Sequence, residues 1–304
     1  MEFNEQQQEV RTWLKRRQGI LLAHNYQPGE IQDVADFLGD SLALSMTAAQ
    51  TPAEVIVFCG VHFMAETAAI LCPDKTVLLP RTDVGCYMAD TITSEQLKKR
   101  KAELPGVPVV TYVNSSAAVK AESDICCTSA NAIQVVNSLT APRVLMVPDR
   151  NLALYTARRT DKEVLYWDGC CNIHDGLDPA EVVACQAAHP DAVFIAHPEC
   201  RPEVLDLAQA IRSTSGMLQY VRQSPVQEFI IGTEMGIIHT LQKENPGKLF
   251  YSPSPQLVCL DMKRITLADV IAALQENRYR IEVPEETRRR ALQAVERMLA
   301  VPRD

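Results

Sequence analysis

The 304-residue sequence has no apolar run long enough to cross a bilayer, and its first twenty residues hold no hydrophobic segment typical of a signal peptide. We therefore expect no membrane span and a cytoplasmic location. In that compartment the ten cysteines are expected to be free thiols rather than a disulfide framework.

Two kinds of binding also have no support. The sequence contains neither the P-loop pattern G-x-x-x-x-G-K-[ST] nor the dinucleotide pattern G-x-G-x-x-G. Its formal net charge of −8 argues against a nucleic-acid-binding face. The apolar fraction of 47% is that of an ordinary globular protein, and the length suits two or three folded units.

Strand-like and helix-like segments alternate along the chain, and two-residue hairpin signals are almost absent. This alternation is typical of parallel sheets flanked by helices. Three buried strands end in polar residues at His24, Tyr112 and His197, which are separated by 88 and 85 residues. The helices expected after these strands cover 31–38, 117–122 and 202–211.

Each of these runs continues with two further expected strands, the last of which leads to a cysteine. The spacing predicts three similar α/β units, at 1–88, 89–173 and 174–261, and C-terminal helices at 262–304 that cover the first unit. Ligands of parallel sheets lie beyond the carboxyl ends of the strands. We therefore expect three small parallel-sheet domains in a pseudo-threefold arrangement around one central site.

Cys86, Cys171 and Cys259 follow the last strand of each unit and are separated by 85 and 88 residues. Three sulfur ligands from three units suit an iron–sulfur cluster or zinc, with one coordination position open. No C-x-x-C pair with metal-binding spacing is present, and a lone cysteine is often only a small core residue. Cys170 fits the spacing as well as Cys171.

Polar residues near the strand ends are the other candidates. Glu199, close to His197, suits either a general base or a helix cap. Tyr26, Tyr112 and Asn114 suit either turns or carboxylate binding. Hydroxyl residues at 41, 129, 213 and 214 are expected at helix N-termini, whose free N–H groups also bind anions.

Motifs along nearly the whole chain carry a resemblance to one family. They are Leu22-Ala-His-Asn-Tyr-Gln27, Gly39-Asp-Ser-Leu42, Gly60-Val-His-Phe-Met-Ala-Glu66, Gly85-Cys86, Tyr112-Val-Asn-Ser115, Pro148-Asp149, Trp167-x-Gly-x-Cys171-x-x-His174, His197-Pro-Glu-Cys200, Ser213-Thr-Ser-Gly216, Thr233-Glu-Met-Gly236 and Cys259-x-x-Met262. In this order they resemble the quinolinate synthases, iron–sulfur enzymes of de novo NAD biosynthesis. The match at Trp167 to His174 favours Cys171 over Cys170.

The resemblance implies a 4Fe-4S cluster held by Cys86, Cys171 and Cys259, whose fourth iron has no protein ligand and acts as a Lewis acid. It implies condensation of iminoaspartate with dihydroxyacetone phosphate to quinolinate, with loss of phosphate and two waters. Functional coupling to the enzyme that supplies iminoaspartate is expected. The substrate pocket implied consists of His24, Ser41, Tyr112, Asn114, Ser129, His197, Glu199, Ser213 and Thr214. Glu199 is the candidate general base, assisted by His197 and Tyr26.

The chain departs from the family pattern at Ala130, where a serine is expected, and at Leu260-Asp261, which stand in place of the frequent Pro-Asn. Three other functions use the same residues: a metabolite-binding module without iron, an iron–sulfur redox sensor, and a zinc-dependent lyase. Metal content and product formation distinguish them.

Overall fold

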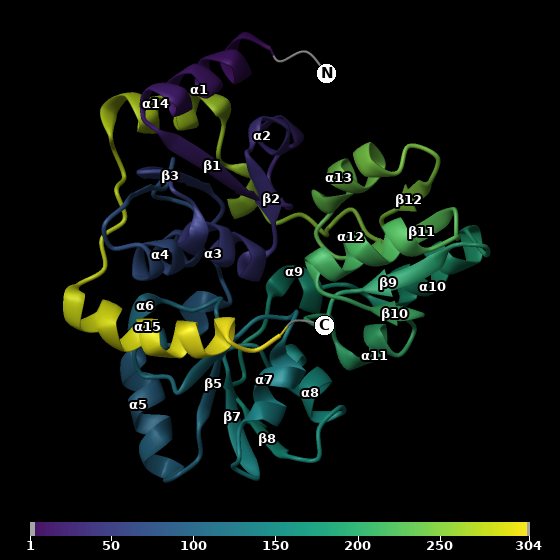
Figure 1. The fold of residues 1–304 in the computed structure, drawn as a ribbon. Helices are drawn as coiled ribbons and strands as arrows, with labels where there is room; N and C mark the ends of the chain where they lie inside the picture. Colours follow the sequence, from purple (N-terminus) through teal and green to yellow (C-terminus); the bar gives the residue numbers. More distant parts are fainter. Residues whose placement is uncertain (1–3, 303–304) are drawn as a thin grey trace.

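A computed structural model describes residues 4–302 of the chain. Its strands form three separate four-stranded sheets, and every strand pair within them is parallel. In Figure 1 the first sheet lies at the top, the second at the bottom and the third at the right. The prediction of an α/β fold with three similar parallel-sheet units is confirmed.

The first sheet has the strand order β2-β1-β3-β4. Its strands are β1 (Gly19–His24), β2 (Phe37–Gly39), β3 (Val55–Cys59) and β4 (Thr76–Leu78). The helices around it are α1 (Glu5–Arg16), α2 (Gly29–Val34), α3 (Ser41–Gln50) and α4 (His62–Leu71). All five residues of β3 are buried, as expected for a parallel strand covered on both faces.

The second sheet repeats this order as β6-β5-β7-β8. Its strands are β5 (Val109–Tyr112), β6 (Ile125–Cys127), β7 (Arg143–Val147) and β8 (Glu163–Tyr166). Its helical segments are η1 (Ala89–Thr91), α5 (Ser94–Glu103), α6 (Ala117–Lys120), α7 (Ala132–Ser138) and α8 (Arg150–Ala157).

The third sheet has the order β10-β9-β11-β12, again with the unit's first strand in second place. Its strands are β9 (Val193–Ala196), β10 (Ala210–Ile211), β11 (Glu228–Gly232) and β12 (Leu249–Tyr251). Its helical segments are α9 (Asn172–Asp175), α10 (Pro179–Ala188), α11 (Pro202–Leu205), α12 (Thr214–Gln223), α13 (Ile237–Glu244) and η2 (Asp261–Lys263). One strand order used three times places the same strand ends at the same edge of each unit.

Each unit has a short edge strand after a short helix, and the expected helices of the first and third units overran this strand. The helix expected over 31–38 stops at Val34, and Phe37–Gly39 pairs with β1 as β2. The Asp36 carboxylate accepts the N–H of Leu21 at 2.8 Å, and the Asp36 N–H donates to the Leu21 carbonyl. These two bonds return the chain to the sheet edge, so the helix cannot continue.

The third unit repeats this correction, and in the second unit the expected helix was about two residues too long. The helix expected over 117–122 stops at Lys120 and is followed by β6, and the one expected over 202–211 stops at Leu205 and is followed by β10. Asp124 and Gln209 hold the first strands of these units through side-chain bonds of 2.7 and 2.8 Å, as Asp36 does in the first.

A lysine in front of the last strand of each unit is a further repeated feature. Lys75, Lys162 and Lys248 immediately precede β4, β8 and β12. Each ammonium group donates to backbone carbonyls at or just after the end of the helix that precedes the neighbouring strand (β3, β7 or β11), which is α3, α7 or α12. A cation at this place satisfies orphan carbonyls and complements the helix dipole.

The C-terminal helices are α14 (Leu267–Glu276) and α15 (Glu285–Leu299). α14 packs on α1 and β3 of the first unit. α15, the yellow helix between the upper and lower sheets in Figure 1, contacts α4 of the first unit and α6 and β6 of the second. Arg290 on α15 forms a 2.8 Å ion pair with Glu122, so this helix bridges two units.

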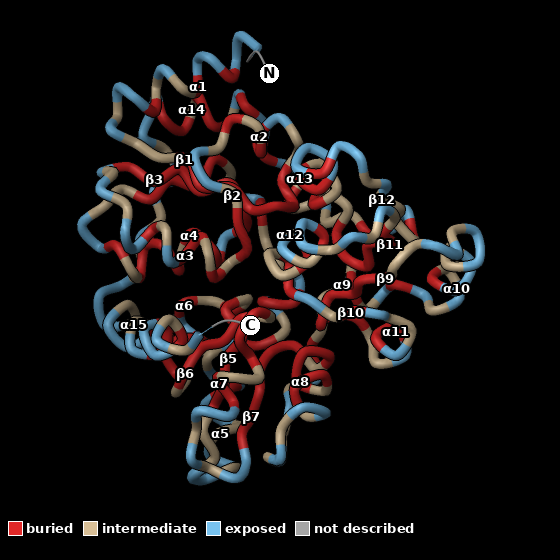
Figure 2. Tube along the Cα trace, turned by 45° about the vertical axis from the view of Figure 1, so that its right-hand side comes forward, coloured by how far each residue is buried: buried red, intermediate tan, exposed pale blue. Residues whose placement is uncertain are grey.

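Burial follows the sheets and the junction between the units. Figure 2 shows the strands and the inner turns of the helices buried, while the outer turns of the helices are exposed. One large apolar cluster contains buried residues of all three units. Within the described part of the chain, no helix is both long enough and apolar enough to pass through a bilayer.

Candidate active site

A cavity of about 310 Å³ lies where the three units meet. Its wall includes His24 at the end of β1, Tyr112 at the end of β5 and His197 just after β9. The cavity is therefore formed at the carboxyl ends of the strands, as predicted for parallel sheets. Its volume is at the lower end of the range for small-molecule sites.

Four sets of matched residues line this cavity, each with one member from each unit. The sets are His24, Tyr112 and His197; Tyr26, Asn114 and Glu199; Ser41, Ser129 and Thr214; and Cys86, Cys171 and Cys259. The spacing within the first three sets is 88 and 85 residues. The structure thus brings together in one cavity nearly all of the residues that the sequence singled out.

Ser213 and Cys170 are the exceptions among the residues weighed. The Ser213 hydroxyl accepts the Gly216 N–H at 3.2 Å and caps α12, and Ser213 is not among the described residues that line the cavity. Its neighbour Thr214 lines the wall instead. Likewise Cys171 lines the cavity and Cys170 does not.

Glu199 is a buried acid of the site with three side-chain neighbours, Tyr112, His174 and His197. It is 4% exposed and accepts a 2.5 Å hydrogen bond from the Tyr112 hydroxyl. His174 Nδ1 lies 3.0 Å and His197 Nδ1 3.8 Å from its oxygens. Burial opposes ionisation, but the facing imidazoles and the hydrogen bonds from His174 and Tyr112 hold the pKa of Glu199 below its usual range. Glu199 is therefore a carboxylate at neutral pH.

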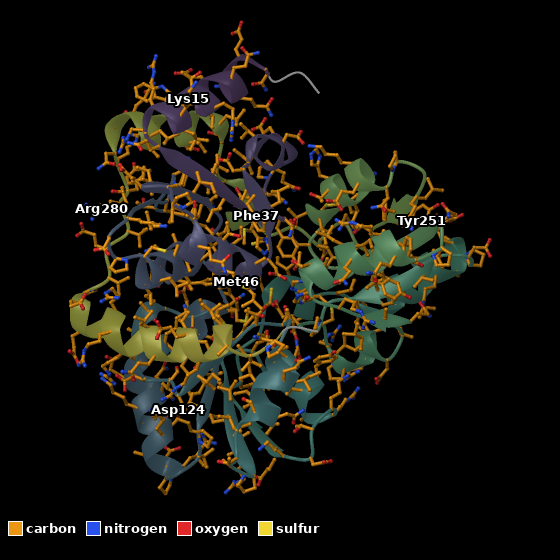
Figure 3. The ribbon with its side chains drawn as sticks, in the orientation of Figure 1. Lys15, Phe37, Met46, Asp124, Tyr251 and Arg280 are labelled. Carbon is orange, nitrogen blue, oxygen red and sulfur yellow. The ribbon has the colours of Figure 1, made fainter. Side chains whose placement is uncertain are left out.

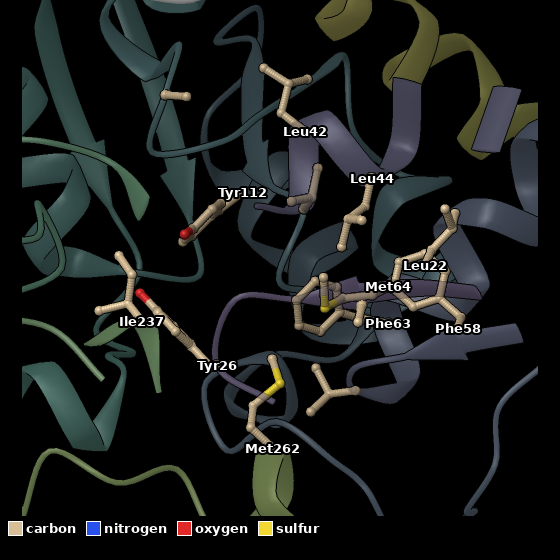
Figure 4. Close-up of a cluster of buried hydrophobic side chains, with 14 of the residues drawn as sticks. Leu22, Tyr26, Leu42, Leu44, Phe58, Phe63, Met64, Tyr112, Ile237 and Met262 are labelled. Atoms are coloured by element: carbon tan, nitrogen blue, oxygen red, sulfur yellow. The ribbon is translucent and has the colours of Figure 1, made fainter. Parts of the chain in front are cut away.

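A chain of polar contacts joins the first unit to the third. Thr233 Oγ1 lies 2.6 Å from the Tyr26 hydroxyl and 2.8 Å from His174 Nε2. The Tyr26 hydroxyl also lies 2.9 Å from Thr214 Oγ1. Figure 4 shows Tyr26 and Tyr112 with their hydroxyl ends directed towards each other. His174 and Thr233 were not among the predicted site residues, although both stand in motifs that the sequence displays.

His24 and His197 of the cavity are neutral at neutral pH. Burial lowers the pKa of His24 to about 4 and that of His197 to about 3. His174 stacks on His197 with ring centroids 4.7 Å apart. Arg264 is the sole lysine or arginine that residues 4–302 contribute to the cavity wall. Apart from Arg264, the groups that can bind anions inside the cavity are hydroxyls, amides and imidazoles.

The three matched cysteines suit metal binding better than nucleophilic chemistry. All ten cysteines are free. Burial raises the pKa of Cys86 to about 12 and raises the pKa values of Cys171 and Cys259, so none is a thiolate on its own. A bound metal replaces such protons. Backbone N–H groups two or three residues downstream face each sulfur, an environment that iron–sulfur sites use.

The positions of the three cysteines also distinguish a site for an iron–sulfur cluster from a site for a single metal ion. Among the described residues, the one group whose ligand atoms lie close enough to hold one metal ion is Cys171, His174 and Glu199, within 4.8 Å of one another. The three cysteines do not form such a group, although they line the same cavity. Three sulfurs spread in this way suit a multi-iron cluster, because a zinc ion needs its ligands about 2 Å away.

The comparisons with known proteins agree with this site. The family model described as Quinolinate synthetase A protein matches residues 8–300. The chain is 58% identical over 296 residues to a quinolinate synthase of Geotalea uraniireducens, with 97% of each chain covered. It is 57% identical over 297 residues to one of Geobacter metallireducens, with 98% of each covered. It is 56% identical over 295 residues to one of Methanoregula boonei, with 97% of this chain and 98% of the relative covered.

Proposed function

The chain belongs to the quinolinate synthase family, and we propose that its central cavity condenses iminoaspartate with dihydroxyacetone phosphate. The products are quinolinate, phosphate and two waters, and this set balances every atom of the two substrates. The observation that carries the proposal is the convergence of four matched residue sets on one cavity at the junction of the units.

Quinolinate synthases of this family carry a 4Fe-4S cluster. In our proposal Cys86, Cys171 and Cys259 hold it, because they are free and half-buried, have backbone N–H groups facing their sulfurs, and line one cavity. A cluster with three cysteine ligands supplies an iron with Lewis acidity for the loss of water when it is bound.

The chain's own residues bind and orient two anionic substrates. Both substrates carry acidic groups, and the cavity offers them donors at Ser41, Ser129 and Thr214, supported by the Ser213 cap. His24, Tyr112 and His197 complete the proposed binding wall. The amide oxygen of Asn114 is buried and lacks a protein partner among the described residues, so it is ready to accept an N–H or O–H from a substrate.

Glu199 is proposed to take up protons during the isomerisation and ring-closure steps. Its carboxylate is ionised and shielded from water, and it reaches His174 and Tyr112 directly. Its depressed pKa means that a proton taken up from a substrate is released again readily, while the hydrogen bonds from Tyr112 and His174 keep the carboxylate oriented. His197, whose Nδ1 lies 3.8 Å from Glu199, and Tyr26, another residue of the cavity wall, are proposed to assist these transfers.

Two wider proposals complete the assignment. The enzyme acts in the cytoplasm, which ten unpaired cysteines support because a reducing compartment keeps thiols free. It is functionally coupled to the enzyme that supplies iminoaspartate, since a free imine hydrolyses in water.

The decisive experiment measures iron, acid-labile sulfide and quinolinate formation on anaerobically purified protein, with Cys171→Ala as the matched variant. We expect about four irons per chain and turnover in the wild type, and loss of both in the variant. Iron without product would favour a redox sensor, zinc with product a zinc-dependent lyase, and metabolite binding without either metal a binding module. Cys170→Ala is the control, because Cys170 does not line the cavity.

A further inference from the structure

Each unit contains an equivalent backbone hydrogen bond close to its cysteine of the matched set, and these three bonds show which residues of the units correspond. His62 N–H donates to the Val84 carbonyl at 3.0 Å, Arg150 N–H to Gly169 at 2.8 Å, and Met235 N–H to Leu257 at 2.9 Å. Each acceptor stands two residues before a cysteine of the matched set, and each donor follows the residue at 61, 149 or 234. Val61, Asp149 and Glu234 are therefore structural counterparts.

Asp149 holds the loop that carries Cys171. Its side chain is buried at 2% exposure, and one carboxylate oxygen accepts the Cys171 N–H at 3.2 Å. The other oxygen accepts the Leu152 N–H at 2.6 Å, which fixes the carboxylate to the first turn of α8. The position of Cys171 is thus tied through one side chain to a helix.

Glu234 does the same for the loop that carries Cys259. It is 1% exposed, one oxygen accepts the Cys259 N–H at 3.2 Å, and the other accepts the Gly236 N–H at 2.7 Å. Lys263 adds a 2.9 Å ion pair to the same carboxylate. Two units with different acids thus arrive at the same bond to the cysteine backbone.

The first unit has Val61 at the place of Asp149 and Glu234, so this position supplies no carboxylate to the Cys86 loop. A carboxylate from the third unit takes over: Asp261 Oδ1 lies 3.4 Å from the Gly85 N–H. This contact is longer and its side chain is 34% exposed. Arg264 ties Asp261 to the Cys86 loop. Its guanidinium lies 3.3 Å from the Asp261 carboxylate and 3.2 Å from the carboxylate of Asp83, which belongs to that loop.

We propose that Asp149, Glu234 and Asp261 are positioning residues for the iron–sulfur cluster, each fixing the backbone of one cysteine-bearing loop. The inference rests on the proposed function, because it takes the three cysteines as the cluster's ligands. Residues that hold metal ligands in place commonly change metal retention when they are removed. Asp261 stands two residues after Cys259 and bonds beside Cys86, so it joins the loops of two ligands. The Cys86 loop, held by the longest and most exposed contact, is the first to open when the cluster is lost.

The test follows iron release to a ferrous chelator from the anaerobically reconstituted full chain, without substrates. We expect Asp149→Ala, Glu234→Ala and Asp261→Ala to release iron about tenfold to a hundredfold faster than the wild type. Asp149→Asn and Asp261→Asn each keep one acceptor oxygen, and we expect intermediate rates from them. The two asparagine variants also keep the test possible if an alanine variant does not fold.

Asp124→Ala is the matched control, because Asp124 accepts the Val109 N–H at 2.7 Å at the start of β5, whereas the cavity with the three matched cysteines lies at the carboxyl ends of the strands. Asp124 is labelled in the lower part of Figure 3. We expect this variant to unfold at a lower temperature and to release iron at the wild-type rate. Wild-type release rates in all three alanine variants, or an equal acceleration in Asp124→Ala, would overturn the inference. A wild-type chain that binds no iron would overturn the proposed cofactor site and this inference with it.

Discussion

The Tyr112 hydroxyl donates a 2.5 Å hydrogen bond to Glu199 Oε1, and this bond crosses from the second sheet to the third. Both side chains are at least 95% buried. The candidate base therefore takes its closest donor from another unit, and the reacting geometry depends on how the units are held together.

Tyr112→Phe tests this bond directly. The variant keeps the ring and removes the donor to Glu199. We expect kcat to fall by about a hundredfold, because the carboxylate loses its alignment and its nearest proton partner. Turnover should be measured at wild-type iron content, and an unchanged kcat would show that the hydroxyl has no part in the reaction.

Glu199→Gln tests the base itself. The amide keeps the shape and cannot take up a proton, so we expect kcat to fall by a factor of about 100 to 10,000 while the cluster is retained. Glu203→Gln is the matched control, since Glu203 is exposed on α11. Full turnover of Glu199→Gln with an intact cluster would refute the assignment.

Acid should destabilise the chain through His24 and His197. Burial lowers the pKa of His24 to about 4 and that of His197 to about 3, below the ordinary value near 6.5. The unfolded chain therefore binds more protons between these values, so this part of the stability is complete above pH 6.5 and is lost as the pH falls towards 4 and 3. At pH 5 we expect each histidine to reduce the free energy of unfolding by about 2 kcal/mol.

Denaturant unfolding of the iron-free chain between pH 4.5 and 7.5 measures this slope. His24→Asn removes one titrating group and keeps an acceptor for the Tyr26 N–H, which His24 Nδ1 accepts at 3.2 Å. The variant should show a shallower pH dependence than the wild type. Parallel curves would mean that His24 does not titrate as proposed.

Arg264 should draw the substrates to the cavity. Its side chain is 47% exposed, and Tyr87 and Leu260, two other exposed residues of the cavity wall, are 63% and 70% exposed. We expect Arg264→Gln to lower kcat/KM about tenfold, more than it lowers kcat, and to weaken the dependence on ionic strength. Arg280→Gln is the control: it has a similar exposure, 48%, and is not among the described residues that line the cavity (Figure 3). Equal salt dependence of both variants would contradict the prediction.

The repeat in the sequence was enough to predict the fold class, and together with the family resemblance it predicted most of the residues that line the cavity. Spacings of 88 and 85 residues align His24, Tyr112 and His197 before any contact is known, because equivalent strand ends in repeated units occupy equivalent places. The same spacing identifies Thr214, rather than Ser213, as the partner of Ser41 and Ser129, and the structure places Thr214 in the wall.

What the sequence could not predict depends on contacts between distant segments. β2, β6 and β10 have three, three and two residues, too short to display an alternating pattern. They form because Asp36, Asp124 and Gln209 bond to a neighbouring strand. The role of Thr233 likewise arises from atoms of the first and third units meeting in space, and no local pattern encodes such a meeting.

The threefold framework has one more consequence, which concerns orientation. In a cavity built from three like units, a small planar molecule has three nearly equivalent orientations, related by one third of a turn. These orientations differ in the groups they place next to the molecule, because the first and second units have Tyr26 and Asn114 where the third has Glu199. A substrate turned by one third of a revolution would meet a phenol or an amide instead of a carboxylate. Because the three copies have diverged, only one orientation of the substrate in this nearly symmetric cavity is productive.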